Sequence, residues 1–260
     1  MQVDPTQGSD DSILTIDAPD AAGPFFLVCE HASNRFPAEY GTLGLDDEAQ
    51  AACIAWDPGA LGLAQNLSRL LDAPLFSARV SRLIYDLNRP PLAATVMPAQ
   101  SKGWQIPGNA DLTAQERLRR LDAIYIPFHD RLRREILRRV MLATETGLVP
   151  VLVTVHSFAP VVDGEPRSVE FGVIHDADPL LAQAVVDLAR ETTPLITALN
   201  EPYSETEDIT HTLRLQATPC GIANVMLEIR NDLLSTPEAQ AHVAAMLAPV
   251  LRGALERITA

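Results

Sequence analysis

Three apolar runs of this chain lead directly into acidic, basic or imidazole side chains. The run FFLVC is followed by Glu30 and His31, the run LVPVLVTVHS contains His156, and the run NVMLEIRND contains Glu228 and Arg230. Continuous runs of Val, Ile and Leu are typical of strands that are buried on both faces of a parallel sheet. Because ligands bind outside the carboxyl ends of such strands, this pattern predicts a functional site at one edge of an α/β sheet.

Strand and helix patterns alternate along the rest of the chain. Apolar runs predict strands over 25–30, 74–86, 149–155, 169–174 and 223–229, and helical periodicity predicts helices over 46–56, 60–72, 113–145, 178–191 and 236–257. We therefore expect a single α/β domain over residues 21–260, with helices on both faces of a mostly parallel or mixed central sheet. Residues 1–20 are expected to form a flexible N-terminal arm, and the Pro-rich stretch 90–110 a loop or lid.

The composition argues against several classes of partner. With 260 residues and 47% apolar content, the chain can bury a full core as one domain. Its formal net charge of −14 argues against nucleic acid or an anionic membrane as the main partner, because phosphate binding needs clustered cations. No run approaches the roughly 18 apolar residues that span a bilayer. Three widely spaced cysteines favour free thiols, so we expect a cytoplasmic protein.

The two histidines at strand ends indicate a metal or acid/base site. A single histidine beside an apolar run is more often a structural residue, but His31 and His156 lie at the ends of separate predicted strands. Catalytic zinc sites keep three protein ligands, often two histidines and a carboxylate. Asp57, Glu30 or Glu228 could supply that carboxylate, and spacing alone does not choose among them. The chain has no HExxH motif, so distant segments must assemble such a site.

Glu228 and Arg230 lie two residues apart near the end of a predicted strand, so their side chains point to the same face. If that face opens into a cleft, Glu228 is a candidate general base that takes a proton from zinc-bound water. Arg230 is then a candidate for binding an anionic group of the substrate. The alternative interpretation is a structural ion pair between the two residues.

The segment VSRLIYDLNRPP brings Arg82, Asn88 and Arg89 together within eight residues. The guanidinium group binds carboxylates through two parallel hydrogen bonds, and a neighbouring amide adds a directional one. These three residues are therefore candidates for binding a substrate carboxylate, with ordinary solvated loop residues as the alternative. Tyr203, in a later polar loop, is a further candidate for substrate contact.

Two other classes of function remain open at this point. One is a noncatalytic binding module that holds an anionic metabolite through its arginines without metal. The other is a serine or cysteine hydrolase, which requires Ser157, Cys29 or Cys220 as nucleophile. The chain has no GxSxG motif, which disfavours the serine hydrolase, and no GxGxxG or phosphate-binding loop, which disfavours a nucleotide enzyme.

Seven motifs, in this order, resemble the N-formylglutamate amidohydrolase family over residues 25–235: EHASNRFP, WDPGALGLAQNLSRLLDAPL, SRLIYDLNRP, PFHDRL, TVHSF, LNEPYS and NVMLEIRND. The resemblance implies a fold like that of zinc carboxypeptidases and aspartoacylases, of the phosphorylase/hydrolase-like type. It also implies hydrolysis of the amide bond of an N-formyl or N-acyl amino acid, in particular an acidic one like N-formylglutamate, by a zinc-activated water. A small peptide is an alternative substrate for an enzyme of this kind.

The resemblance also implies roles for individual residues. One Zn²⁺ ion would be held by His31 and His156, Glu228 would be the general base, and Asn88 and Arg89 would hold the substrate carboxylate. Independently of the resemblance, the acidic chain would repel a dicarboxylate, so an anionic substrate requires a local cationic pocket formed by Arg82, Arg89 and Arg230.

The third metal ligand departs from the carboxypeptidase pattern. That pattern has a glutamate three residues after the first histidine, and this chain has Asn34 there. The ligand is therefore Asp57, Glu30 or Asn34. Asp57 is favoured, because it lies in the loop at the start of the WDPG helix and can reach the cleft directly. Glu30 would require a strand residue to turn its side chain to the opposite face of the sheet.

Overall fold

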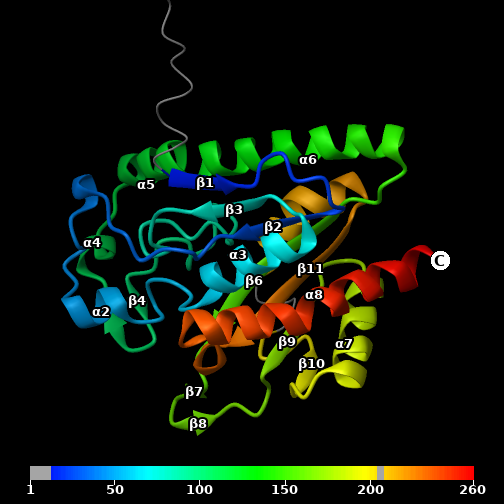
Figure 1. Cartoon of the computed structure of the whole chain (residues 1–260). Coiled ribbons are helices and arrows are strands. Elements are labelled where there is room, and N and C mark those ends of the chain that lie inside the picture. The colour runs from blue at the N-terminus through cyan, green and yellow to red at the C-terminus, as the bar shows by residue number, and fades with distance from the viewer. Residues whose placement is uncertain (1–12, 204–207) are drawn as a thin grey trace, which may run out of the picture.

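A seven-stranded mixed sheet forms the centre of the computed structural model (Figure 1), which describes residues 13–203 and 208–260. The sheet order is β1-β3-β2-β6-β11-β9-β10. The four central strands β3, β2, β6 and β11 run parallel to one another. On the two sides of this group, β1 pairs antiparallel with β3 and β9 pairs antiparallel with β11, while β10 runs parallel to β9. The strands span Leu14–Asp17 (β1), Phe25–Cys29 (β2), Leu75–Ala78 (β3), Val151–Phe158 (β6), Phe171–Ile174 (β9), Thr197–Leu199 (β10) and Ala223–Arg230 (β11). The predicted α/β fold with a mixed sheet is confirmed.

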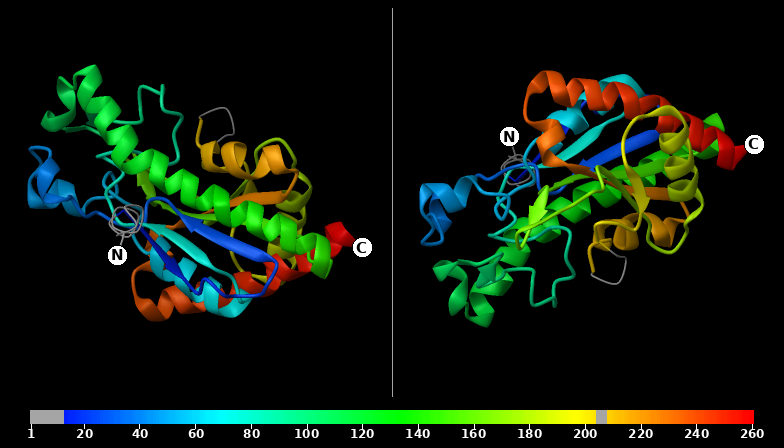
Figure 2. Two further views of the ribbon diagram at one scale, coloured as in Figure 1. Left: turned by 90° about the horizontal axis from the view of Figure 1, so that it is seen from above. Right: turned by 90° about the horizontal axis from the view of Figure 1, so that it is seen from below.

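Helices cover both faces of this sheet, as Figure 2 shows from above and below. One face packs against α3 (Ala60–Leu71), α7 (Leu180–Thr192) and α8 (Pro237–Thr259), and the other against α6 (Ile126–Thr146), which follows α5 (Ala114–Arg120) through a π-helical turn. Neighbouring strand residues face opposite cores: Leu152 packs in the core on the α6 side and Val153 in the core under α3 and α8. Burial on both faces explains why these strands are apolar without alternation.

No helix among the described residues is long and apolar enough to cross a bilayer.

The remaining short elements are α2 (Asp47–Ala51), the β4–β5 hairpin (Gln100–Ser101 and Trp104–Gln105), α4 (Pro107–Ala110), the β7–β8 hairpin (Val161–Val162 and Glu165–Pro166), and helical turns at Ala38–Tyr40, Leu121–Tyr125, Leu213–Ala217, Thr218–Cys220 and Asn231–Leu234.

Three local expectations need correction. Within the expected arm, Leu14–Asp17 forms β1 and pairs with β3, while residues 1–12 lie outside the described part of the chain. The strand expected over 74–86 ends at Ala78, because the following backbone turns away from the sheet and Arg82 N donates to Ala55 O at 3.2 Å. The stretch 90–110 contains the β4–β5 hairpin and α4 rather than a loop alone.

The carboxyl ends of β2, β6 and β11 meet at one edge of the sheet. His31 follows the end of β2 by two residues. His156 and Glu228 each lie two residues before the carboxyl end of their strand, β6 and β11 respectively. The register pairs Glu228 with His156, so these side chains emerge next to one another. The expectation that this edge gathers polar residues from distant segments therefore agrees with the structure.

Candidate metal centre and active site

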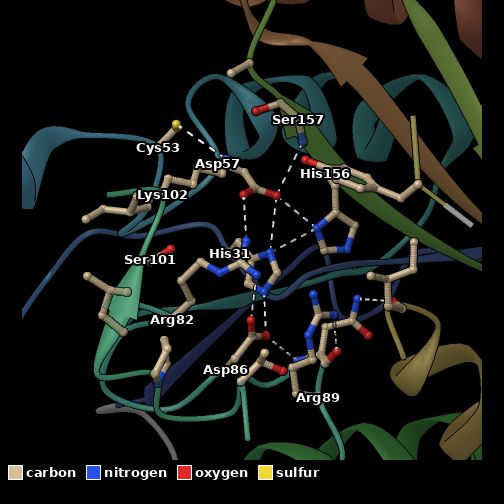
Figure 3. Close-up of a pocket in the computed structure, with 18 of the residues that line it drawn as sticks. His31, Cys53, Asp57, Arg82, Asp86, Arg89, Ser101, Lys102, His156 and Ser157 are labelled. Atoms are coloured by element: carbon tan, nitrogen blue, oxygen red, sulfur yellow. Dashed lines mark hydrogen bonds and ion pairs between the residues drawn. The ribbon is translucent and has the colours of Figure 1, made fainter. Parts of the chain in front are cut away.

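His31, Asp57 and His156 form a buried cluster of three ligand atoms (Figure 3). His156 Nδ1 lies 2.9 Å from Asp57 Oδ2 and 3.2 Å from His31 Nδ1, and His31 Nδ1 lies 3.3 Å from Asp57 Oδ2. Three donors that converge within such distances can all contact one ion. Two imidazole nitrogens and one carboxylate oxygen form a donor set that occurs in catalytic zinc sites.

The loop before α3 brings Asp57 to this cluster. Asp57 N donates to His31 O at 2.9 Å, which ties the loop to the segment after β2. Gly59 then begins α3 with a φ of 81°, and a Cβ atom at this position would lie 2.4 Å from Leu234 Cβ. Only glycine combines this backbone conformation with so close an approach, so the sequence WDPG favours the observed path of the chain.

The second nitrogen of each imidazole faces a further carboxylate. His31 Nε2 lies 2.8 Å from Asp86 Oδ1, and His156 Nε2 lies 3.3 Å from Glu30 Oε2. Metal-binding histidines characteristically pair their other ring nitrogen with such a group, which orients the ring and raises the basicity of the ligand nitrogen. The residues around the cluster therefore fit a bound cation.

The charges of the cluster also favour a cation. Burial raises the pKa of Asp57, Glu30 and Asp86, yet the neighbouring imidazoles, and Arg82 beside Asp86, hold all three pKa values below their ordinary range. Burial lowers the pKa of His156, but Glu30 and Asp57 raise it well above its ordinary value. Three ionised carboxylates thus surround the two imidazoles. Arg82 and the protonated His156 offset part of this negative charge in the metal-free protein, and a bound divalent cation would replace the imidazole proton.

The three candidates for the third metal ligand lie in different surroundings. Asp57 lies in the cluster, whereas Glu30 faces the far nitrogen of His156. Asn34 is exposed, and its amide donates to Gln50 O at 3.1 Å. Among these three positions, only Asp57 shares the convergence point with both histidines.

Glu228 faces the cavity beside the cluster. Its side chain is buried, and Oε2 has no hydrogen-bond partner among the described residues. Burial raises the pKa of Glu228 to about 7, with His156 opposing and Asp57 adding to the shift. A carboxyl group with this pKa exchanges a proton readily at neutral pH, as a general base requires.

The arginines of the candidate carboxylate site differ in their partners. Arg82 lies between Asp57 and Asp86, at 3.4 Å and 2.6 Å, so its charge is already paired. Arg89 donates through Nη1 to Asn88 O and forms no ion pair within the part of the chain that the structure describes. Both guanidinium groups line the cavity, but only that of Arg89 is free of a carboxylate.

The other candidate substrate residues are divided between the cavity and its surroundings. Asn88 lines the cavity, but its amide is hydrogen-bonded to Ile209 O and Thr212 N. Tyr203 also lines the cavity, and Arg167 stacks over its ring at 5.0 Å. Arg230 is not a lining residue and instead pairs with Glu170 and Asp232, at 3.2 Å and 2.8 Å.

The candidate nucleophiles lack the surroundings of a serine or cysteine hydrolase. Ser157 Oγ donates to Pro58 O at 2.8 Å. Cys29 is fully buried, and burial raises the pKa of its thiol well above the ordinary value. Cys220 is half-buried and is not a lining residue of the cavity.

The cavity has a volume of about 240 Å³ and opens outward from the cluster. This volume lies below the roughly 300–1,000 Å³ of drug-sized sites, so the cavity suits a small metabolite. Two lining residues that sequence reasoning missed are Cys53 and Lys102, which comes from the β4–β5 hairpin. The helix expected over 46–56 ends at Ala51, which leaves Cys53 in the following turn, and Lys102 lies in the Pro-rich stretch without periodicity, although it is distinctive as the only lysine of the chain.

Comparisons with known proteins identify the family and the fold of the chain. Residues 23–235 match the model of the family N-formylglutamate amidohydrolase. A gene product from Agrobacterium tumefaciens of known crystal structure is 43% identical, with a TM-score of 0.90 over 96% of this chain and 98% of the other. An N-formylglutamate amidohydrolase from Ralstonia eutropha is 20% identical and shares the fold, with a TM-score of 0.66 over 94% of this chain and 98% of that one. No curated protein matches the sequence.

Proposed function

Because the chain belongs to the N-formylglutamate amidohydrolase family, we propose that it hydrolyses the amide bond of an N-formyl or N-acyl acidic amino acid with one bound Zn²⁺ ion. The observation that carries this proposal is the convergence of His31 Nδ1, His156 Nδ1 and Asp57 Oδ2. When bound there, the cation would supply Lewis-acid activation of the amide carbonyl and of the attacking water.

Glu228 would move the proton in this reaction. Glu228 lines the cavity and its Oε2 has no hydrogen-bond partner among the described residues, so the carboxyl group could accept a proton from the water that attacks the acyl carbon. A new C–O bond forms as the C–N bond breaks, and Glu228 then returns the proton to the leaving amine. The products are formate, or the corresponding acid, and the free amino acid.

Arg89 would bind a carboxylate of the amino-acid portion, because it lines the cavity without a carboxylate of its own. Arg82 would instead hold Asp57 and Asp86 in place through its two ion pairs. Asn88 would position the segment around Ile209 and Thr212 rather than bind substrate directly, since both polar atoms of its amide are engaged. All three cysteines are free, which supports a reducing cytoplasm as the location.

Hydrolysis assays on purified, zinc-loaded protein test this proposal. N-formyl-L-glutamate, N-acetyl-L-glutamate and their neutral glutamine counterparts would be supplied with the protein before and after removal of metal by a chelator. We expect release of free amino acid that is lost with the metal and restored by Zn²⁺. A protein that binds small carboxylates but holds no stoichiometric metal and hydrolyses none of these compounds would be a binding module instead.

A further inference from the structure

Lys102 is the only lysine in the chain, since the other 19 of its 20 Lys and Arg residues are arginines. It lies at the tip of the β4–β5 hairpin and lines the same cavity as His31, Asp57 and Glu228. The unbranched stem and compact charge of lysine differ from the broad guanidinium fork. The one position with this side chain thus faces the proposed substrate.

The backbone of the hairpin holds Lys102 in an uncommon conformation. Lys102 and Gly103 form a two-residue loop with φ angles of 45° and 85°, the pattern of a type I′ turn. Glycine, asparagine and aspartate are the usual residues at the first position, because a longer side chain is disfavoured at positive φ. Such outliers cluster at ligand-binding sites, where surrounding structure and function maintain them.

No described carboxylate compensates the charge of Lys102. Its Nζ atom lies 3.7 Å from Cys53 Sγ, and it forms no ion pair with a carboxylate among residues 13–203 and 208–260. Arg89 is another lining cation without a carboxylate partner among the described residues, and Figure 3 shows it near Asp86, whereas Lys102 lies near Cys53. Two separate positive charges thus line the cavity that contains the metal cluster.

We propose that Lys102 binds the second carboxylate of a dicarboxylic substrate while Arg89 binds the first, which makes Lys102 a determinant of specificity for acidic side chains. This inference rests on the proposed function, because it assumes that the amino-acid portion of the substrate occupies the cavity. Two unpaired cations at separate positions of one cavity fit an amino-acid portion with two carboxylates, whereas a monocarboxylate leaves one cation without a partner.

Substrate discrimination tests this role. Lys102→Met removes the charge and keeps an unbranched side chain, and we expect it to lower kcat/KM for N-formyl-L-glutamate by about 10- to 100-fold, as for a lost hydrogen bond between charged groups. Activity toward N-formyl-L-glutamine should stay within about twofold of wild type, and Lys102→Arg should restore much of the discrimination. Arg131→Met, an exposed change on α6 with the same effect on net charge, is the control. Equal losses on both substrates, or no loss, would overturn the proposal.

Chemical labelling tests the same contact without turnover. An amine-reactive ester can modify only one side-chain amine in this chain, and mass spectrometry separates it from the terminal α-amine, which serves as the internal reference. We expect glutarate to slow the labelling of Lys102 in the zinc-loaded protein and butyrate to leave it unchanged. Labelling that glutarate does not slow would refute the contact. An enzyme that hydrolyses no N-acyl amino acid would refute the proposed function instead, and the labelling result would still decide about Lys102.

Discussion

Glu228 on β11 is paired in register with His156 on β6, so a buried carboxyl group lies beside an imidazole of the candidate metal centre. The parallel ladder between these two strands sets this separation, because both side chains project from the same level of the sheet. Neither residue depends on a mobile loop for its position. The proposed general base and a proposed metal ligand are thus held together by two paired strands whose residues are almost all buried.

Glu228→Gln should separate catalysis from structure. The substitution keeps the shape but removes the proton acceptor, so we expect kcat to fall by about 10²- to 10⁴-fold, the range for general acid/base catalysis, with little change in KM or zinc content. Steady-state kinetics and metal analysis of the same preparation provide the measurement. A variant with full activity would exclude Glu228 as the base.

The same variant should change stability in a pH-dependent way in the metal-free protein. Burial raises the pKa of Glu228 to about 7 from an ordinary 4.5, so its contribution to stability is complete below pH 4.5 and is lost as the pH rises to about 7. A glutamine side chain does not ionise, so it avoids this loss of stability at high pH. Glu228→Gln should therefore have a higher Tm than wild type at pH 8, with a smaller difference at pH 5. A lower Tm at pH 8 would indicate a structural carboxylate.

Loss of either histidine ligand should abolish zinc binding. His31→Ala and His156→Ala each remove one of the three converging donors, so we expect metal content and activity to fall together while the circular dichroism spectrum remains that of a folded α/β protein. His242→Ala, an exposed change on α8, is the matched control. Full zinc occupancy in either ligand variant would contradict the assignment.

Asp57 and Glu30 should differ in their effects on zinc affinity. Asp57→Asn weakens a direct ligand, whereas Glu30→Gln changes a partner of His156 and should cost about 10- to 100-fold in affinity, as other outer partners do. Competition with a chromogenic chelator measures both dissociation constants. We expect the weaker binding in Asp57→Asn, and the reverse order would assign the third ligand to Glu30.

Arg89→Lys should affect acidic substrates selectively. The change keeps a positive charge but loses the two-pronged hydrogen bonding of the guanidinium group, which we expect to cost about 1–3 kcal/mol in transition-state binding of N-formyl-L-glutamate. For a substrate whose α-carboxylate is converted to an amide, we expect a smaller loss in kcat/KM. Equal losses in kcat/KM on both substrates would show that Arg89 supports the loop rather than recognition.

His129 should make the fold sensitive to acid. Its Nε2 lies 2.9 Å from Leu87 O and its Nδ1 lies 3.1 Å from Gln216 Nε2, so both nitrogens have partners when the ring is neutral. Burial lowers its pKa to about 4 from 6.5, with His211 and Arg133 adding to the shift and Glu30 opposing it. Its contribution to stability is thus present above pH 6.5 and lost as the pH falls toward 4. Denaturant unfolding should show that His129→Gln costs less free energy at pH 5 than at pH 7.5, and a cost independent of pH would contradict this.

Local sequence patterns predicted the strands that lead to the site, because burial on both faces leaves an apolar run that ends where the chain reaches the sheet edge. The same criterion failed for residues 79–86. Four of its eight residues are apolar and most are buried, but its backbone donors go to several separate segments: Ser81 N donates to Arg35 O, Arg82 N to Ala55 O and Asp86 N to Val96 O. Burial in a loop and burial in a sheet leave similar sequence patterns.

The sequence by itself determined the parallel core and the edge at which His31, His156 and Glu228 emerge, since these follow from apolar runs within single segments. Only the tertiary structure decided that Asp57 meets both histidines, from 26 and 99 residues away. It also decided that Arg230 turns to Glu170 and that the hairpin brings Lys102 to the cavity. Periodicity reports which face of an element is buried, whereas contacts between distant loops depend on how the elements pack against one another.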